Sequence, residues 1–165
     1  MLKGYHKLNK AITKQLKPFG ISRAVGADDY AYYYQSEMIT YRLTLHDCDE
    51  AYSDFIYERF GYEDTDVFII SLLHEVGHHM TDEDITQNVY DFCMKEKARI
   101  CEEIQHAHGA DWTKLQYEYF QLPDEIMATA WAVDYAKKHP KKVRKMWKKC
   151  EKALHKFYDK NLGDY

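Results

Sequence analysis

The chain has 165 residues, with 23 Lys or Arg against 27 Asp or Glu and a formal net charge of −4. A chain of this length buries about 70% of its unfolded surface without metal or disulfide cross-links, which favours a single domain over residues 1–165. Its 7 Gly and 3 Pro exclude collagen-like and low-complexity classes, and 15 Tyr argue against disorder. The small net charge excludes a protein that is basic over its whole surface, and the 9 His prompt a search for metal or proton-transfer chemistry.

Helical periodicity dominates the chain and predicts a mostly helical α+β fold with a C-terminal helical part. Alternation with period two occurs only at residues 38–45, and the tyrosine-rich segment 30–34 before it predicts a hairpin or small antiparallel sheet. Capping residues, glycines and prolines indicate where the helices end. The predicted helices span residues 2–17, 49–60, 67–80, 82–108, 112–121, 123–139 and 140–160.

Signals for export or membrane insertion are absent from the sequence. The N-terminus lacks an apolar core of signal-peptide length, and the longest apolar run, 67–73, is interrupted by Ser71. Four cysteines without a CxxC pair favour buried thiols in a reducing compartment. We therefore expect a cytoplasmic protein that does not span a membrane.

The strongest chemical motif is His74-Glu75-Val76-Gly77-His78. On an α-helix, residues i and i+4 lie on one side, so His74 and His78 can both bind one Zn²⁺. Glu75 then lies beside the metal, where it can act as general base toward a water that the metal acidifies. The motif continues an apolar run, in which unpartnered polar groups would be costly. Hydrogen-bonded core histidines are the alternative interpretation.

A catalytic zinc site usually has three protein ligands, so a third is needed. Glu125 is the leading candidate, because it shares a helical face with small residues that would let its helix approach the motif helix. Gly77, which costs about 1 kcal/mol in a helix, is also explained by such close approach. Those small residues are Ala128, Thr129 and Ala132. An acid favoured by the helix dipole is the alternative interpretation of Glu125.

Other ligands remain open at this point. Asp84 lies six residues after His78, where an extended form of the motif places its third ligand, but Thr81 replaces the glycine that such a turn uses. Thr81 or Asp82 is expected to cap the following helix instead. The remaining candidates are His46, His106 and His108.

The HExxH motif followed by Glu125-Ile126-Met127-Ala128 resembles the gluzincin branch of zinc metallopeptidases, and in particular the small ImmA/IrrE-like proteins. The resemblance implies a zincin-like fold with His74, His78 and Glu125 as Zn²⁺ ligands and Glu75 as general base. It also implies a peptide or protein substrate that lies along an edge strand above the motif helix, here residues 38–45. Thr129 departs from the Asn or Asp usual in these relatives.

The sequence favours a zinc-dependent peptidase and leaves one residue role unassigned. Four side chains are chemically able to stabilise the oxyanion. These are Tyr90, Tyr117, Tyr119 and His79. The alternative function is a catalytically silent, zinc-binding regulatory or interaction protein of a phage or mobile element.

The segment from Lys137 to Lys160 is strongly basic, with a net charge of +9, so that the rest of the chain sums to −13. Apolar residues recur within it at spacings of three and four, which predicts an amphipathic helix at about 140–160 with a lysine-rich outer face. A solvated face of a packed terminal helix is the simplest interpretation. Docking onto the acidic body and contact with nucleic acid or another polyanion are the alternatives.

Overall fold

The computed structural model describes residues 2–43, 50–63 and 66–161, and it has the mostly helical α+β fold that the sequence predicts. His46, Cys48 and the end of the predicted strand at 38–45 lie outside the described residues. In chain order the helices and strands are α1 (Tyr5–Leu16), β1 (Arg23–Ala27), β2 (Ala31–Tyr33), β3 (Met38–Arg42), α2 (Glu50–Phe60), α3 (Val67–Thr81), α4 (Gln87–Ile104), α5 (Ala110–Phe120), α6 (Pro123–Lys138) and α7 (Pro140–Asn161).

The sheet is mixed and has the strand order β1-β3-β2. The expected hairpin is present, since β2 pairs antiparallel with β3 and Tyr32 lies opposite Ile39. β1 adds a parallel strand on the other side of β3, with Val25 opposite Thr40. β3 is therefore the central strand. The expectation that residues 38–45 form the edge available to a substrate is wrong, because both edges of β3 are occupied and the edge strands are β1 and β2.

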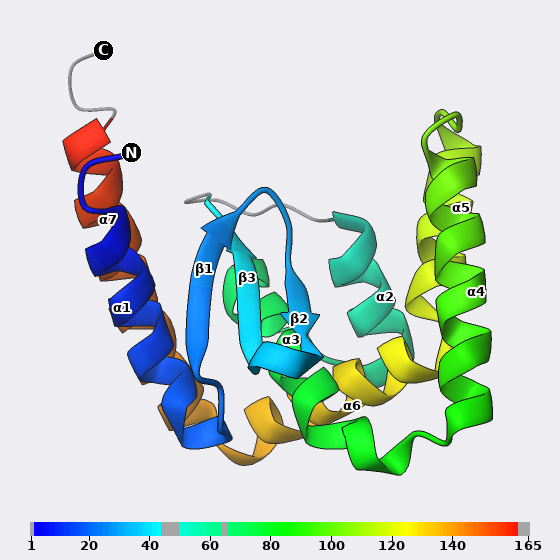
Figure 1. The fold of residues 1–165 in the computed structure, drawn as a ribbon, viewed down its shortest axis with the longest axis horizontal. Coiled ribbons are helices and arrows are strands. Elements are labelled where there is room, and N and C mark those ends of the chain that lie inside the picture. Colours follow the sequence, from blue (N-terminus) through cyan, green and yellow to red (C-terminus); the bar gives the residue numbers. More distant parts are fainter. Residues whose placement is uncertain (1, 44–49, 64–65, 162–165) are drawn as a thin grey trace.

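α3 runs behind the sheet and crosses α6, so these two helices form the centre of the molecule (Figure 1). Its start is set by Asp66, whose carboxylate accepts a hydrogen bond from the backbone N–H of Phe68 at 3.0 Å. Nearly every residue of α3 up to Gly77 is buried, as its continuous apolar run predicts. The helix that carries the HExxH motif is thus a core element.

The predicted helix at 82–108 is divided in the structure. Asp82–Asp84 form a short 3₁₀ turn, and α4 begins only after Thr86. The N-cap residue of α4 is Thr86, not Thr81. The hydroxyl of Thr81 instead donates to the carbonyl of Gly77, in its own helix α3, at 2.9 Å. The expectation that Thr81 or Asp82 caps the next helix is therefore wrong.

Two helix pairs flank the central part at opposite ends of the molecule (Figure 1). α4 and α5 pack through a small cluster that includes Cys93, Ile100 and Leu115. α1 and α7 lie side by side at the other end, where Leu8, Ile12 and Leu16 join the main core. None of the described helices is long and apolar enough to cross a membrane.

Candidate metal centre

Gly77 sets the separation of the two central helices. A Cβ atom built on Gly77 would lie 2.3 Å from the backbone carbonyl oxygen of Ala128 in α6, far inside van der Waals contact. Ala128 and Ala132 are fully buried, so small side chains line the facing surface of α6 as well. The expected close approach of another element at Gly77 is confirmed, and it brings the first turn of α6 to the motif helix.

The approach of α6 places Glu125 next to both motif histidines. Glu125 Oε2 lies 3.0 Å from His74 Nε2, and Glu125 Oε1 lies 3.4 Å from His78 Nε2. The two Nε2 atoms are 3.1 Å apart. His74 and Glu125 are buried, while His78 is partly exposed. Among the described residues, these three side chains form a group that can hold a metal ion.

Thr129, one helical turn after Glu125, orients the first histidine. Its Oγ1 lies 2.9 Å from His74 Nδ1 and 3.4 Å from the hydroxyl of Tyr52. When Nδ1 of His74 carries the proton and donates to Thr129, the lone pair of Nε2 faces Glu125 and His78. Such a partner on the outer nitrogen is usual for a metal-binding histidine, because it sets both the tautomer and the ring orientation.

Lys97 of α4 brings a positive charge into the same cluster. Its ammonium nitrogen contacts both Asp124 Oδ2 and Glu125 Oε1. Burial alone would lower the pKa of Lys97, but Glu125, Tyr119 and Asp124 raise it above its usual value. Lys97 is therefore charged at neutral pH.

The two glutamates of the site differ in their charge state. Burial would raise the pKa of Glu125, yet His78 and His74 outweigh it and hold the pKa well below its usual range. Burial raises the pKa of Glu75 to about 7, although His74 opposes the shift. Glu125 is thus an anion that can bind a cation. At neutral pH, Glu75 is about equally divided between its protonated and ionised forms.

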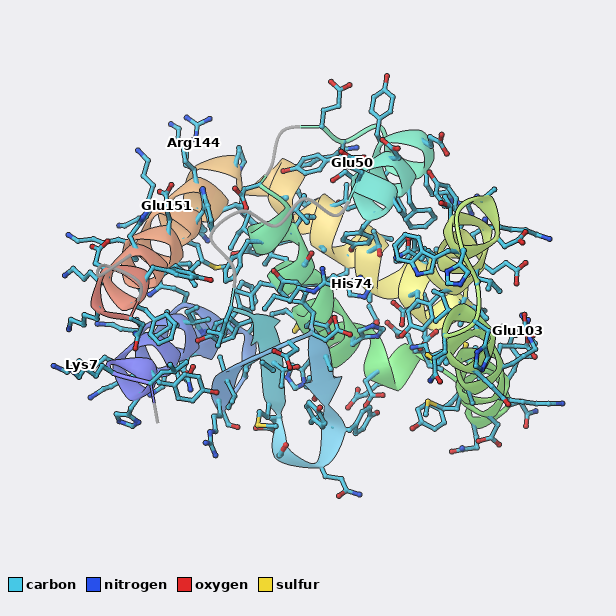
Figure 2. The ribbon with its side chains drawn as sticks, turned by 90° about the horizontal axis from the view of Figure 1, so that it is seen from above. Lys7, Glu50, His74, Glu103, Arg144 and Glu151 are labelled. Atoms are coloured by element: carbon cyan, nitrogen blue, oxygen red, sulfur yellow. The ribbon has the colours of Figure 1, made fainter. Side chains whose placement is uncertain are left out.

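A cavity of about 490 Å³ opens over the three residues, and Glu75 lines it together with them. Its walls come from β2 and the residues before it, from α4 and from α5. Six of the lining residues are tyrosines, namely Tyr30, Tyr32, Tyr34, Tyr52, Tyr90 and Tyr119. His74 lies near the middle of the molecule, between the two end pairs of helices (Figure 2). Space for a ligand therefore exists directly above the candidate metal-binding group.

The other candidate ligands lie elsewhere. Asp84 is exposed in the 3₁₀ turn after α3, and His106 and His108 are exposed beyond the end of α4. None of the three belongs to the metal-binding group found among the described residues. Of the candidates that lie in the described residues, Glu125 is the one that the structure brings together with His74 and His78, while His46 lies outside the described residues.

The four candidates for oxyanion stabilisation differ in whether they line the cavity. Tyr90 and Tyr119 line the cavity. Tyr117 packs against Phe55 and Phe120, and His79 bonds through Nδ1 to the hydroxyl of Tyr32 at 2.7 Å. Of the two that line the cavity, Tyr119 lies beside the charged cluster of the site, since its ring centroid is 5.4 Å from the Lys97 ammonium.

Lys97 and Asp124 were missed by sequence reasoning. The position of Asp124 directly before Glu125 was a signal that could have identified it. Lys97 lies within a charged stretch of α4 that gives no sign of burial. Thr129 was noted as a small residue on the Glu125 face and as a departure from the family pattern, but not as a partner of His74. Its spacing of four residues from Glu125 was the signal for a partner of the motif histidine.

Searches of protein-family models, curated proteins and solved structures find no match to this chain.

Proposed function

We propose that the chain is a zinc-dependent peptidase. The observation that supports this most strongly is the convergence of His74, His78 and Glu125 on one point in the floor of the cavity. Zinc bound to nitrogen or oxygen at about 2.0–2.1 Å with tetrahedral geometry needs ligand atoms about 3.4 Å apart. The two Nε2 atoms are 3.1 Å apart, and each faces a different oxygen of Glu125, His74 facing Oε2 at 3.0 Å and His78 facing Oε1 at 3.4 Å, so each of these separations is close to that requirement. Two imidazoles and a carboxylate are also a donor set that zinc accepts.

Zinc held by His74, His78 and Glu125 would polarise the scissile carbonyl and lower the pKa of the attacking water. Glu75 accepts the proton of that water and passes it to the leaving amine, a role for which a pKa of about 7 is well placed. Thr129 keeps His74 in the orientation that presents Nε2. Lys97, charged and beside Tyr119, adds positive potential on the side where negative charge would develop.

The substrate in this proposal is an extended peptide that adds to the sheet along β2. β2 pairs with β3 on one side only, and Ala31 and Tyr32 from this strand line the cavity. A peptide backbone can hydrogen-bond to such an edge while alternate side chains enter the pocket. The tyrosine-rich walls favour apolar or aromatic side chains there.

Metal content tests the ligands. After equilibration with zinc and gel filtration, wild-type protein is expected to retain about one zinc per chain. His74→Ala and Glu125→Ala should lose it, whereas Asp84→Ala, a control at the exposed acid, should keep it. Folded wild-type protein that retains no zinc would contradict the proposal.

Cleavage tests the reaction. Glu75→Gln should keep zinc and lower the cleavage rate of a peptide library by about 10²-fold or more, because the general base is lost. Wild-type cleavage should stop with a chelator and return with added zinc. Cleavage that persists in Glu75→Gln would overturn the assignment of this residue.

Lys97 favours a second candidate, a catalytically silent zinc-binding module that acts through a partner. Its ammonium contacts the same Glu125 oxygen that faces His78, and so competes with a metal for that oxygen. This candidate predicts bound zinc without zinc-dependent cleavage of any library peptide, and equal biological activity of wild type and Glu75→Gln.

A further inference from the structure

The pair of helices α1 and α7 concentrates the positive charge of the molecule at one end. Residues 1–27 contain six Lys or Arg and no Asp or Glu, and residues 137–160 have a net charge of +9. Separated in the sequence, these two segments are brought together because α1 and α7 pack side by side. They carry +15 together, so the remainder of the chain carries −19. The protein is therefore strongly polarised.

The cations of this pair point outward. Figure 2 shows Lys7 and Arg144 on the outer side of their helices, at the end of the molecule opposite Glu103. We call the exposed cations of α1, α7 and their immediate flanks the basic flank. It comprises Lys3, Lys7, Lys10, Lys14, Lys17, Lys141, Lys142, Arg144, Lys145, Lys148, Lys149, Lys152, Lys156 and Lys160.

These cations lack carboxylate partners among the described residues. Within residues 2–43, 50–63 and 66–161, no Asp or Glu forms an ion pair with any member of the basic flank, although five other Lys or Arg residues in these ranges do have such partners. Five of the members, from Lys141 to Lys149, surround a hollow on α7 and are the described residues that line it. The self-repulsion of so many like charges is unfavourable unless an external polyanion relieves it.

We propose that the basic flank binds the phosphate backbone of double-stranded nucleic acid. α7 has 22 residues and is about 33 Å long at 1.5 Å per residue, close to one turn of B-DNA at about 34–36 Å. Duplex DNA presents one negative charge per about 1.7 Å of its axis, which matches a surface with many cations and few acids. The acidic remainder repels the duplex, so the nucleic acid is confined to this end.

The surface chemistry separates a duplex from other polyanions. None of the large exposed apolar side chains of the described residues lies on α1 or α7. Insertion into a membrane needs apolar groups on the binding face, and binding of single strands uses aromatic side chains on which bases stack. Contact with phosphates alone needs neither. Binding should consequently be independent of sequence and should hold whether or not the metal centre is catalytic.

The test uses the purified full chain and a fluorescent 25-base-pair duplex of arbitrary sequence, followed by fluorescence anisotropy between about 20 and 200 mM NaCl. With six or more phosphate contacts, affinity should fall about 10³-fold or more between 50 and 200 mM salt. A mixed single strand of the same length should bind more weakly. Absence of binding at the lowest salt would overturn the proposal.

Glutamine variants test whether the basic flank is the surface that binds the duplex. Two sets of glutamine substitutions, K141Q/K145Q/K148Q in α7 and K7Q/K10Q/K14Q in α1, should each weaken binding about tenfold or more and reduce the log–log salt slope by up to about 3. The matched control R59Q/K95Q/K114Q removes three exposed cations elsewhere and should leave affinity within about twofold. Circular dichroism establishes that each variant is folded. Equal loss in the control would overturn the assignment to this surface.

Competition decides between classes of partner. Polyglutamate and vesicles containing phosphatidylserine are added to the preformed duplex complex at equal charge concentration. The proposal predicts that neither displaces the duplex. Displacement by polyglutamate would indicate an acidic protein partner instead, and displacement by vesicles a membrane surface, and either result would overturn the proposal.

Discussion

The α3–α6 pair and the α1–α7 pair are both built from packed helices, but they place polar groups in opposite ways. α3 and α6 meet through Gly77 and Ala128, and their contact encloses a histidine, a glutamate and a threonine. α1 and α7 meet through larger side chains such as Tyr5 and Phe157, whose ring centroids are 6.5 Å apart, and Ile12 and Leu154 of the same two helices are fully buried. The Lys and Arg residues of both helices are all exposed.

This difference determines how each pair responds to substitution. In the central pair, backbone touches backbone and every enclosed polar group depends on another, so single changes propagate to the metal-binding group. In the flanking pair, the apolar contact and the charged face are separate. We expect that the charges there can be altered with little effect on stability, whereas a change to a polar group enclosed by the central pair should disturb the neighbouring groups of the candidate metal centre.

The largest effect is expected for Gly77→Ala. The added methyl group would overlap the Ala128 carbonyl, and only a shift of the helix backbones can relieve the overlap. We expect the free energy of unfolding in urea to fall by about 3 kcal/mol, after the gain of about 1 kcal/mol in helix propensity. Met80→Ala, at an exposed position of the same helix, is the control and should change it little. Equal stability of Gly77→Ala and wild type would show that the helices are farther apart.

The next effect concerns the Lys97 ion pairs. Lys97→Met leaves Asp124 and Glu125 without a cation, which should reduce the free energy of unfolding of metal-free protein by about 2 kcal/mol. That is less than for a fully buried pair, because the Lys97 side chain is 18% exposed. Added zinc should recover much of the loss. Lys95→Met, on the exposed side of α4, is the matched control, and equal losses in both variants would contradict the role of Lys97.

A smaller effect is expected at Thr129. Thr129→Val keeps the shape but removes the hydroxyl that His74 Nδ1 contacts, so zinc affinity should fall about tenfold or more, or about 1.4 kcal/mol. Thr129→Ser retains the hydroxyl and should bind zinc like wild type. Titration against a chromophoric chelator measures both. Equal affinities of the two variants would show that His74 does not depend on this contact.

The smallest effect is expected on the charged face of α7. The triple variant K141Q/K145Q/K148Q should change the free energy of unfolding by no more than about 0.5 kcal/mol, since exposed side chains contribute little to stability. Leu154→Ala, on the buried face of the same helix, should cost about 3 kcal/mol. A large loss in the triple variant would show that the two faces of α7 are not independent.

Local patterns predicted most of this fold. Asp66 followed by an apolar run indicated the motif helix and its burial, and the small residues after Glu125 indicated which helix would approach it. The position of β3 in the middle of the sheet was not predictable, because alternation identifies a strand but not its neighbours. The burial of Lys97 depends on contacts between distant segments, and so does the position of α1, with its lysines, beside α7. A single sequence carries no local signal for such contacts.

The hydrogen bonds between Lys3 and Asn161 have a consequence for synthesis. The Lys3 backbone N–H donates to Asn161 Oδ1 at 3.0 Å, and the Asn161 amide donates to the Lys3 carbonyl at 2.8 Å, across 158 positions of sequence. A chain made from its N-terminus can complete this contact only after residue 161 has left the ribosome. Until then the side of α1 that faces α7 lacks its partner, so α1 can dock on β1 early but is fully packed only after α7 has been made.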